Sequence, residues 1–111
     1  MKTTIIGCGN MGLVYARAFL RYNIVSPEEL LLAEKNESRR DELRKMNLGE
    51  VVVADDPKIS QSELLIIAVK PQDFPALAPR IAAHMRPGML VVSIMAGIKI
   101  SQLEKYLSHP T

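Results

Sequence analysis

The sequence is poor in the residues that build disulfides, metal sites and membrane spans. It has one cysteine, Cys8, and two histidines, His84 and His109, among 111 residues. One cysteine cannot form an internal disulfide, and three such residues spread along the chain have no metal-ligand spacing. The longest apolar run, residues 64–69, is far shorter than the roughly 20 residues that span a bilayer. We therefore expect no metal, no membrane segment and a cytoplasmic protein.

The chain also lacks a strong excess of charge of either sign. Its 14 lysines and arginines and 12 aspartates and glutamates give a formal net charge of +2. The basic residues are scattered instead of gathering with aromatics, so a nucleic-acid partner is not expected. Hydrophobic residues make up 48% of the chain, which is enough for one compact core. A single domain over residues 1–111 with a small-molecule partner is the expectation.

Hydrophobic patterning alternates between the strand and helix types. Short apolar runs predict strands over residues 3–6, 30–33, 51–54, 64–69 and 89–94. Helical spacing or helix-start residues predict helices over 11–22, 37–45, 57–61 and 74–85, and from 101 onward. Strictly alternating elements are typical of an α/β fold: a doubly wound parallel sheet of about five strands with helices on both faces.

Particular residues refine this pattern. The helix over 37–45 is strongly charged, and we expect Leu43 and Met46 on its inner face and Gly49 to stop it. Asp56 and Pro57 are a helix-start pair. The run over 64–69 is apolar at every position, which is typical of a central parallel strand covered on both faces.

Three glycines lie in one segment, Gly7-Cys8-Gly9-Asn10-Met11-Gly12. The segment follows a predicted strand, opens a helix and begins a βαβ unit, which is the context a dinucleotide-binding fingerprint requires. Gly7 would permit a tight turn, Gly9 the close approach of a pyrophosphate, and Gly12 the packing of helix on strand. Free amides at the helix start would bind the phosphates. A glycine-rich turn without a ligand is the alternative.

Glu34 ends the second predicted strand, 22 residues beyond Gly12. An acidic side chain there would accept hydrogen bonds from the adenosine ribose and repel a 2′-phosphate, which favours NAD. Lys35, Arg39 and Arg40 follow at once and could hold a 2′-phosphate if Glu34 turned away. A plain surface role for all four residues is also open. NAD is slightly favoured over NADP.

Two further segments follow the fourth and fifth predicted strands, Ala68-Val69-Lys70-Pro71-Gln72 and Ser93-Ile94-Met95-Ala96-Gly97. Ligands of doubly wound sheets bind outside the carboxyl ends of the strands, so these residues could face a ribose or nicotinamide. Equally, Pro71 could merely start a helix and Lys70 be solvated. Cys8 is expected to be a small, partly buried side chain and not a nucleophile.

Taken together, these three segments resemble the N-terminal domain of pyrroline-5-carboxylate reductase along essentially the whole chain. That family is homo-oligomeric and reduces the C=N bond of 1-pyrroline-5-carboxylate to give L-proline with NADPH or NADH. The resemblance implies cofactor contacts from Gly7, Cys8, Gly9, Asn10, Met11, Gly12, Glu34, Lys35, Asp55, Ala68, Val69, Lys70, Pro71 and Ala96. Asp55 would lie near the adenine and Ala96 near the nicotinamide. No catalytic residue is assigned, although Lys70 and Ser93 would lie closest to the ring.

The sequence departs from the family in three respects. Family members often carry serine, arginine or threonine at position 34 and asparagine at position 55, so Glu34 and Asp55 weaken the case for NADP. Family enzymes also continue into a sixth strand and a helical domain that forms the dimer and completes the substrate site. We therefore expect an excised piece or truncated paralogue that binds cofactor without turnover. It could self-associate through the edge strand 89–94.

Two other functions stay open at this point. One is a related NAD(P)-dependent dehydrogenase of another substrate class, and the other is a non-enzymatic, nucleotide-sensing paralogue. A fold alone does not separate them, because function belongs to a site.

Overall fold

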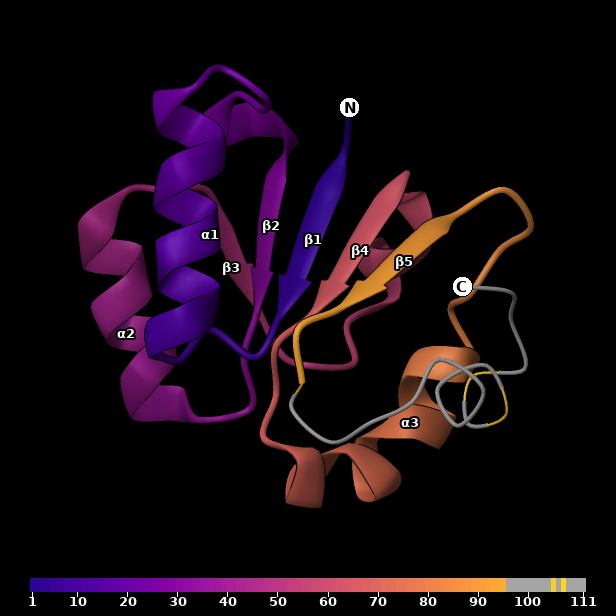
Figure 1. Ribbon diagram of the computed structural model, residues 1–111. Coiled ribbons are helices and arrows are strands. Elements are labelled where there is room, and N and C mark those ends of the chain that lie inside the picture. The colour runs from indigo at the N-terminus through magenta and orange to yellow at the C-terminus, as the bar shows by residue number, and fades with distance from the viewer. Residues whose placement is uncertain (96–104, 106, 108–111) are drawn as a thin grey trace.

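The protein folds around one five-stranded sheet, seen in a computed structural model that describes residues 1–95, Lys105 and Leu107 (Figure 1). All strand pairs are parallel, and the order is β3-β2-β1-β4-β5. The strands are β1 (Thr3–Ile6), β2 (Leu30–Ala33), β3 (Glu50–Val52), β4 (Leu64–Ile67) and β5 (Leu90–Ser93). The predicted doubly wound α/β sheet is confirmed.

Helices cover both faces of this sheet. They are α1 (Asn10–Arg21), α2 (Glu37–Met46) and α3 (Phe74–Ala82), with short 3-10 turns η1 (Pro27–Glu29), η2 (Pro57–Gln61) and η3 (Pro71–Asp73). Strand side chains alternate between faces. Ile5 accordingly packs in the core cluster that contains residues of α1 and α2, whereas Ile6 packs in the cluster that contains α3. Two apolar layers thus enclose the sheet.

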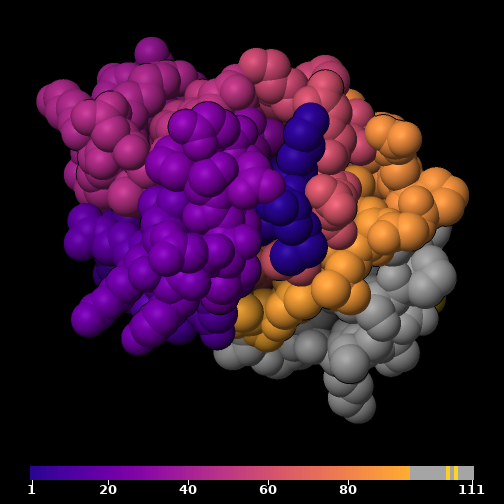
Figure 2. Space-filling model, turned by 90° about the horizontal axis from the view of Figure 1, so that it is seen from above, coloured from indigo at the N-terminus to yellow at the C-terminus, as the bar shows by residue number. Residues whose placement is uncertain are grey.

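Two interior strands of the sheet, β1 and β4, are buried along their whole length. Every residue of β1 and of β4 is buried, as predicted for a strand covered on both faces. Seen from above in Figure 2, the indigo N-terminal segment lies between the purple half and the pink and orange half of the molecule. The hydroxyls of Thr4 and Ser62 are hydrogen-bonded to each other, so neither of these buried polar groups lacks a partner.

Helix α1 is present as predicted, but the residues that bury it are small. Gly12 and Ala16 are buried against the sheet, whereas Met11, Val14 and Tyr22 are each more than half exposed. Small residues on the inner face bring the helix close to the strands. The apolar period therefore predicts the helix correctly but does not identify its inner face.

The predicted stop of the second helix at Gly49 is wrong. Helix α2 ends at Met46, and Asn47 closes it in the left-handed conformation with a φ of 55°. Asparagine is one of the few residues that tolerates this conformation. Glycine is required at position 49 for a different reason: a Cβ there would lie 2.4 Å from the Leu30 carbonyl oxygen. Leu43 is fully buried, as expected.

Three strands are shorter than the apolar runs that predict them. Runs 51–54, 64–69 and 89–94 yield β3, β4 and β5 of three or four residues each. The last residues of the first two runs leave the sheet and line a pocket at its carboxyl edge. The helix predicted over 57–61 coincides with η2, where the Asp56 carboxylate accepts a hydrogen bond from the Lys58 N–H at 2.8 Å.

The end of the chain is described only in part. Of the helix predicted from Ser101 onward, Lys105 and Leu107 are described as helical, and the rest lies outside the described residues. Leu107 is buried in the cluster of α3. Each helix in the described part of the chain is too short or too polar to cross a bilayer.

Candidate functional site

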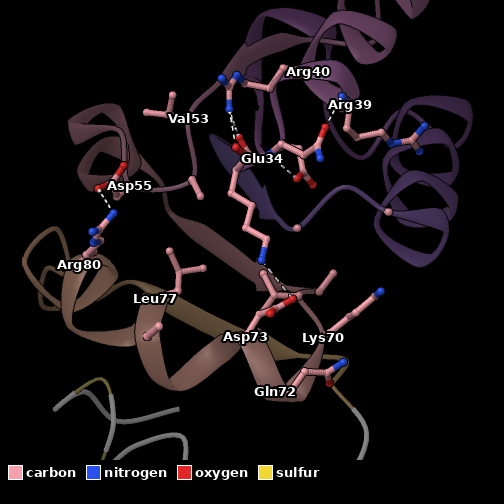
Figure 3. A pocket seen from close by; sticks show the side chains of 18 residues that line it. Glu34, Arg39, Arg40, Val53, Asp55, Lys70, Gln72, Asp73, Leu77 and Arg80 are labelled. Atoms are coloured by element: carbon pink, nitrogen blue, oxygen red, sulfur yellow. Dashed lines mark hydrogen bonds and ion pairs between the residues drawn. The ribbon is translucent and has the colours of Figure 1, made fainter.

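A pocket of about 830 Å³ opens at the carboxyl edge of the sheet (Figure 3). Its walls are the glycine-rich loop after β1, the loops after β2, β3 and β4, and the first turns of α3. Strand β1 pairs with β2 on one side and β4 on the other, so the chain reverses its direction of winding here. Ligands of doubly wound sheets bind at this switch point, and the volume suits a small-molecule site.

Two glycines of the loop are required by the fold itself. Gly7 has a φ of +88°, and a Cβ there would lie 2.6 Å from the Val69 backbone nitrogen. At Gly12 a Cβ would lie 2.5 Å from the Gly7 carbonyl oxygen. The tight turn and the close packing of α1 both occur as expected.

Gly9 differs from the other two glycines. Its φ is −74°, an ordinary value, and apart from its own chain neighbours no atom of the protein lies within 4 Å of the position its Cβ would take. The residue lines the pocket, so a side chain would project into free space. Nothing among the described residues explains the missing side chain, whereas a ligand packed against the backbone would.

The start of α1 has no side-chain cap. Gly9 is the N-cap and provides no side-chain hydrogen bond, whereas the Asn36 side chain caps α2 by accepting from the Arg39 N–H. The first amides of any helix have no partner within it and carry a partial positive charge. The α1 amides that follow Gly9 therefore suit an anionic group.

Glu34 is buried, and this excludes the surface role that the sequence left open for it. Its side chain is hydrogen-bonded to the backbone: Oε1 accepts from the Cys8 N–H at 3.0 Å and Oε2 from the Asn36 N–H at 2.9 Å. An ionised carboxylate has about four acceptor positions, so two are left for a ligand. Glu34 thus holds the glycine-rich loop and still offers acceptors to the pocket.

The two arginines that follow Glu34 are also bound to the backbone. Arg39 Nε donates to the Cys8 carbonyl at 2.8 Å, so the backbone N–H and carbonyl of Cys8 are held by Glu34 and Arg39 respectively. Arg40 Nη1 donates to the carbonyls of Glu34 and Lys35, both at 2.9 Å. Sequence reasoning placed these arginines near a ribose but missed their contacts with the loop.

Two ion pairs join opposite walls of the pocket. Lys35 Nζ lies 3.3 Å from Asp73 Oδ2, and Arg80 Nη1 lies 3.6 Å from Asp55 Oδ2. Lys35 follows β2 and Asp55 follows β3. Their partners lie on the opposite wall, Asp73 in η3 and Arg80 in α3 (Figure 3). Asp73 and Arg80 were not predicted, although their seven-residue spacing is that of one helix face.

The segment after β4 starts a helical turn and also borders the pocket. Pro71 starts η3, and Lys70 is exposed at the rim of the pocket. Within residues 1–95 the structure shows no ion pair for Lys70. Ala68 and Val69 line the pocket as half-buried residues. Ala96 lies outside the described residues.

Cys8 is a buried structural residue. It is 1% exposed, and its Sγ donates to the Ile5 carbonyl at 3.5 Å. Burial first, and then the charge of Glu34, raise the pKa of the thiol to about 12. The thiol is therefore protonated at neutral pH, as expected of a residue that is not a nucleophile. In the part of the chain described here, no three His, Cys, Asp or Glu side chains are grouped for a metal ion.

Comparison with solved structures defines the class of fold. Pyrroline carboxylate reductase of Plasmodium falciparum, solved with NADP bound, matches 96% of this chain and 38% of its own with a TM-score of 0.80. Its sequence identity is 21%, so this likeness concerns the fold alone. The chain has the Rossmann-type fold.

Comparison of sequences then defines the family. The family described as NADP oxidoreductase, coenzyme F420-dependent, matches residues 2–97, and the chain belongs to it. Pyrroline-5-carboxylate reductase of Thermus thermophilus is 36% identical over 98% of this chain and 40% of its own length. ComE operon protein 4 of Bacillus subtilis is 26% identical over 96% of this chain and 40% of its own. The chain thus spans about 40% of these relatives, and the resemblance seen in the three segments is confirmed.

Proposed function

We propose that this chain binds a nicotinamide dinucleotide in the pocket and serves as the cofactor-binding domain of a reductase that acts on 1-pyrroline-5-carboxylate. The observation that carries the proposal is Gly9, a residue without a side chain where the protein leaves room for one. It lies directly before the uncapped start of α1. A pyrophosphate packed on this backbone explains both features.

The remaining parts of the cofactor have natural places in the same pocket. The adenosine ribose would meet the free acceptor positions of Glu34, with the adenine toward Asp55. The nicotinamide half would extend past Val69, Lys70 and Pro71, with Cys8, Asn10 and Met11 contributing backbone to the phosphate loop. Five cationic side chains against three carboxylates line the pocket, which favours an anionic ligand: Lys35, Arg39, Arg40, Lys70 and Arg80 against Glu34, Asp55 and Asp73.

We infer a slight preference for NAD over NADP. The Glu34 carboxylate would repel a 2′-phosphate, and Arg39 and Arg40 donate hydrogen bonds to backbone carbonyls. Lys35 is bound to Asp73. A 2′-phosphate would therefore meet one fixed negative charge and cations that already have partners. The family name and the Plasmodium falciparum structure name NADP, whereas a prephenate dehydrogenase of Aquifex aeolicus was solved with NAD+, so the fold is found with either dinucleotide.

The nicotinamide would supply a hydride, and the residues of this chain would bind and orient the cofactor. The pocket walls would exclude water from one face of the cofactor, and the Lys70 ammonium would attract an anionic substrate toward the exposed face. The C=N substrate is proposed from the Thermus thermophilus relative. We assign no proton donor among the described residues.

Isothermal titration calorimetry with NADH and with NADPH tests the proposal. We expect saturable binding of both cofactors, with NADH tighter by less than about tenfold. The repulsion between the Glu34 carboxylate and a 2′-phosphate is modest in a pocket that is open to solvent. In Gly9→Leu the new Cβ meets no nearby atom, and we expect the rest of the side chain to extend into the pocket that Gly9 lines. This variant is therefore expected to keep its unfolding midpoint and to lose measurable binding of both cofactors.

A neutral control separates blocking from destabilisation. Gln61→Leu adds the same side chain at an exposed position of η2, at the opposite edge of the sheet. It should bind both cofactors like the wild type. Equal affinities of Gly9→Leu and wild type, or no binding by the wild type, would contradict the proposal.

A second candidate function rests on the similarity to ComE operon protein 4. A nucleotide-responsive protein without reductase activity would bind the cofactor in the same pocket. Oxidation of NADH that depends on added 1-pyrroline-5-carboxylate, by a protein that carries this domain, supports the reductase. Binding of NADH without such oxidation supports the second candidate.

A further inference from the structure

The ion pair between Lys35 and Asp73 spans the pocket beside the proposed ribose site. Lys35 directly follows Glu34, and its Nζ lies 3.3 Å from Asp73 Oδ2 on the opposite wall. The Lys35 side chain is 64% exposed and that of Asp73 is 34% exposed. Figure 3 shows Asp73 across the pocket from Glu34. The contact is thus a solvated bridge and not part of the core.

The three cations next to Glu34 differ in what holds them. Arg39 and Arg40 donate to backbone carbonyls of the loops that form the pocket, at 2.8 and 2.9 Å. Moving either arginine would leave these carbonyls without that donor. The Lys35 ammonium contacts only the Asp73 carboxylate among the interactions seen in residues 1–95. Its flexible stem can therefore turn toward a new anion without loss of a backbone hydrogen bond.

We propose that Asp73 is a positioning residue that sets cofactor specificity, because it holds the Lys35 ammonium away from the ribose end of the pocket. The inference rests on the proposed dinucleotide site and deepens it. A 2′-phosphate beside Glu34 needs a mobile cation, and Lys35 is the one that the geometry makes available. To bind NADPH through Lys35, the protein must break the contact with Asp73. Binding of NADH, which has a hydroxyl there, does not require this exchange.

The expected effect is a change in the ratio of the two affinities. Exposed ion pairs are weak, so Asp73→Asn should raise the affinity for NADPH relative to that for NADH by about two- to fivefold. Lys35→Gln should lower the same ratio. In the double variant Lys35→Gln with Asp73→Asn, the ratio should equal that of Lys35→Gln alone, because Asp73 acts through Lys35.

The experiment is calorimetric titration of the four proteins with NADH and NADPH at about 0.15 M salt, where charges more than about 8 Å apart are largely screened. Glu50→Gln is the matched control. It removes one carboxylate from the exposed ion pair with Lys58, at the amino edge of the sheet. The ratio for this variant should equal that of the wild type. Unfolding midpoints of all variants should agree, since every altered side chain is exposed or half-exposed.

Three results would overturn the inference while leaving the proposed function intact. The first is an unchanged ratio in Asp73→Asn, and the second is an equal rise in Glu50→Gln. The third is a rise from Asp73→Asn that persists when Lys35 is glutamine, which would mean direct repulsion by Asp73. Failure of the wild type to bind either cofactor would instead refute the proposed function, and the inference with it.

Discussion

Gly12→Ala is expected to lower the free energy of unfolding by about 1 to 2 kcal/mol and to abolish cofactor binding. The added Cβ would lie 2.5 Å from the Gly7 carbonyl oxygen and 3.4 Å from Ile5 Cγ2. The nearest clash is with backbone, so no side-chain rotation relieves it and α1 must move away from β1. Overpacking costs about 1–3 kcal/mol and occasionally more, and the better helix propensity of alanine offsets at most about 1 kcal/mol.

Chemical denaturation followed by circular dichroism measures this loss. Gly9→Ala is the matched control, because its Cβ meets no atom within 4 Å and its backbone is ordinary. We expect it to change stability by less than about 1 kcal/mol, which is the scale of a helix N-cap substitution. Equal stability of the two variants would show that α1 does not pack on β1 as closely as described.

Glu34→Ala is expected to cost about 2 to 3 kcal/mol of stability and to weaken binding of both cofactors. It leaves the buried Cys8 N–H without an acceptor and removes the bond to the Asn36 N–H. Hydrogen bonds to charged groups contribute about 1.5–3 kcal/mol, and an unsatisfied buried donor costs about 1–3 kcal/mol. Without Glu34 the backbone of Cys8 keeps only its contact with Arg39, so the phosphate loop is less ordered.

Denaturant titration of Glu34→Ala beside Glu50→Ala measures this contribution. Both substitutions remove a glutamate, but Glu50 belongs to an exposed ion pair and should cost less than about 1 kcal/mol. A loss in Glu34→Ala no larger than that in Glu50→Ala would mean that Glu34 serves the ligand alone. An intermediate loss is expected for Glu34→Gln, since one amide oxygen replaces one of the two acceptors.

The parts of this fold that follow from local sequence could be predicted. The hydrophobic patterns of strands and helices repeat every few residues, and the three glycines of the loop lie within six residues. The order of the elements and the phosphate loop are therefore encoded over short distances along the chain. The position of α1 on the sheet was not predicted by its apolar period. Close packing at Gly12 and Ala16 depends on which strand the helix meets, and that is decided by residues elsewhere.

The contacts that shape the pocket could not be read from the sequence for the same reason. Glu34 was identified as an acceptor, but its bond to the Cys8 N–H joins residues 26 positions apart. The bridge between Lys35 and Asp73 joins two walls that come together only when β2 and β4 lie on either side of β1. Charged residues have many possible partners along a chain, and the fold selects among them.

The most direct test of the proposed site is a map of backbone amide chemical shifts during titration with NADH. The account predicts that the largest changes fall on Gly9, Asn10 and Met11, with Glu34 and Lys35 next, because these amides border the pyrophosphate and the ribose. Amides at the amino edge, such as Glu50 and Gln61, should not change. Changes confined to the amino edge, or none at saturating NADH, would contradict a dinucleotide site at the carboxyl edge of this sheet.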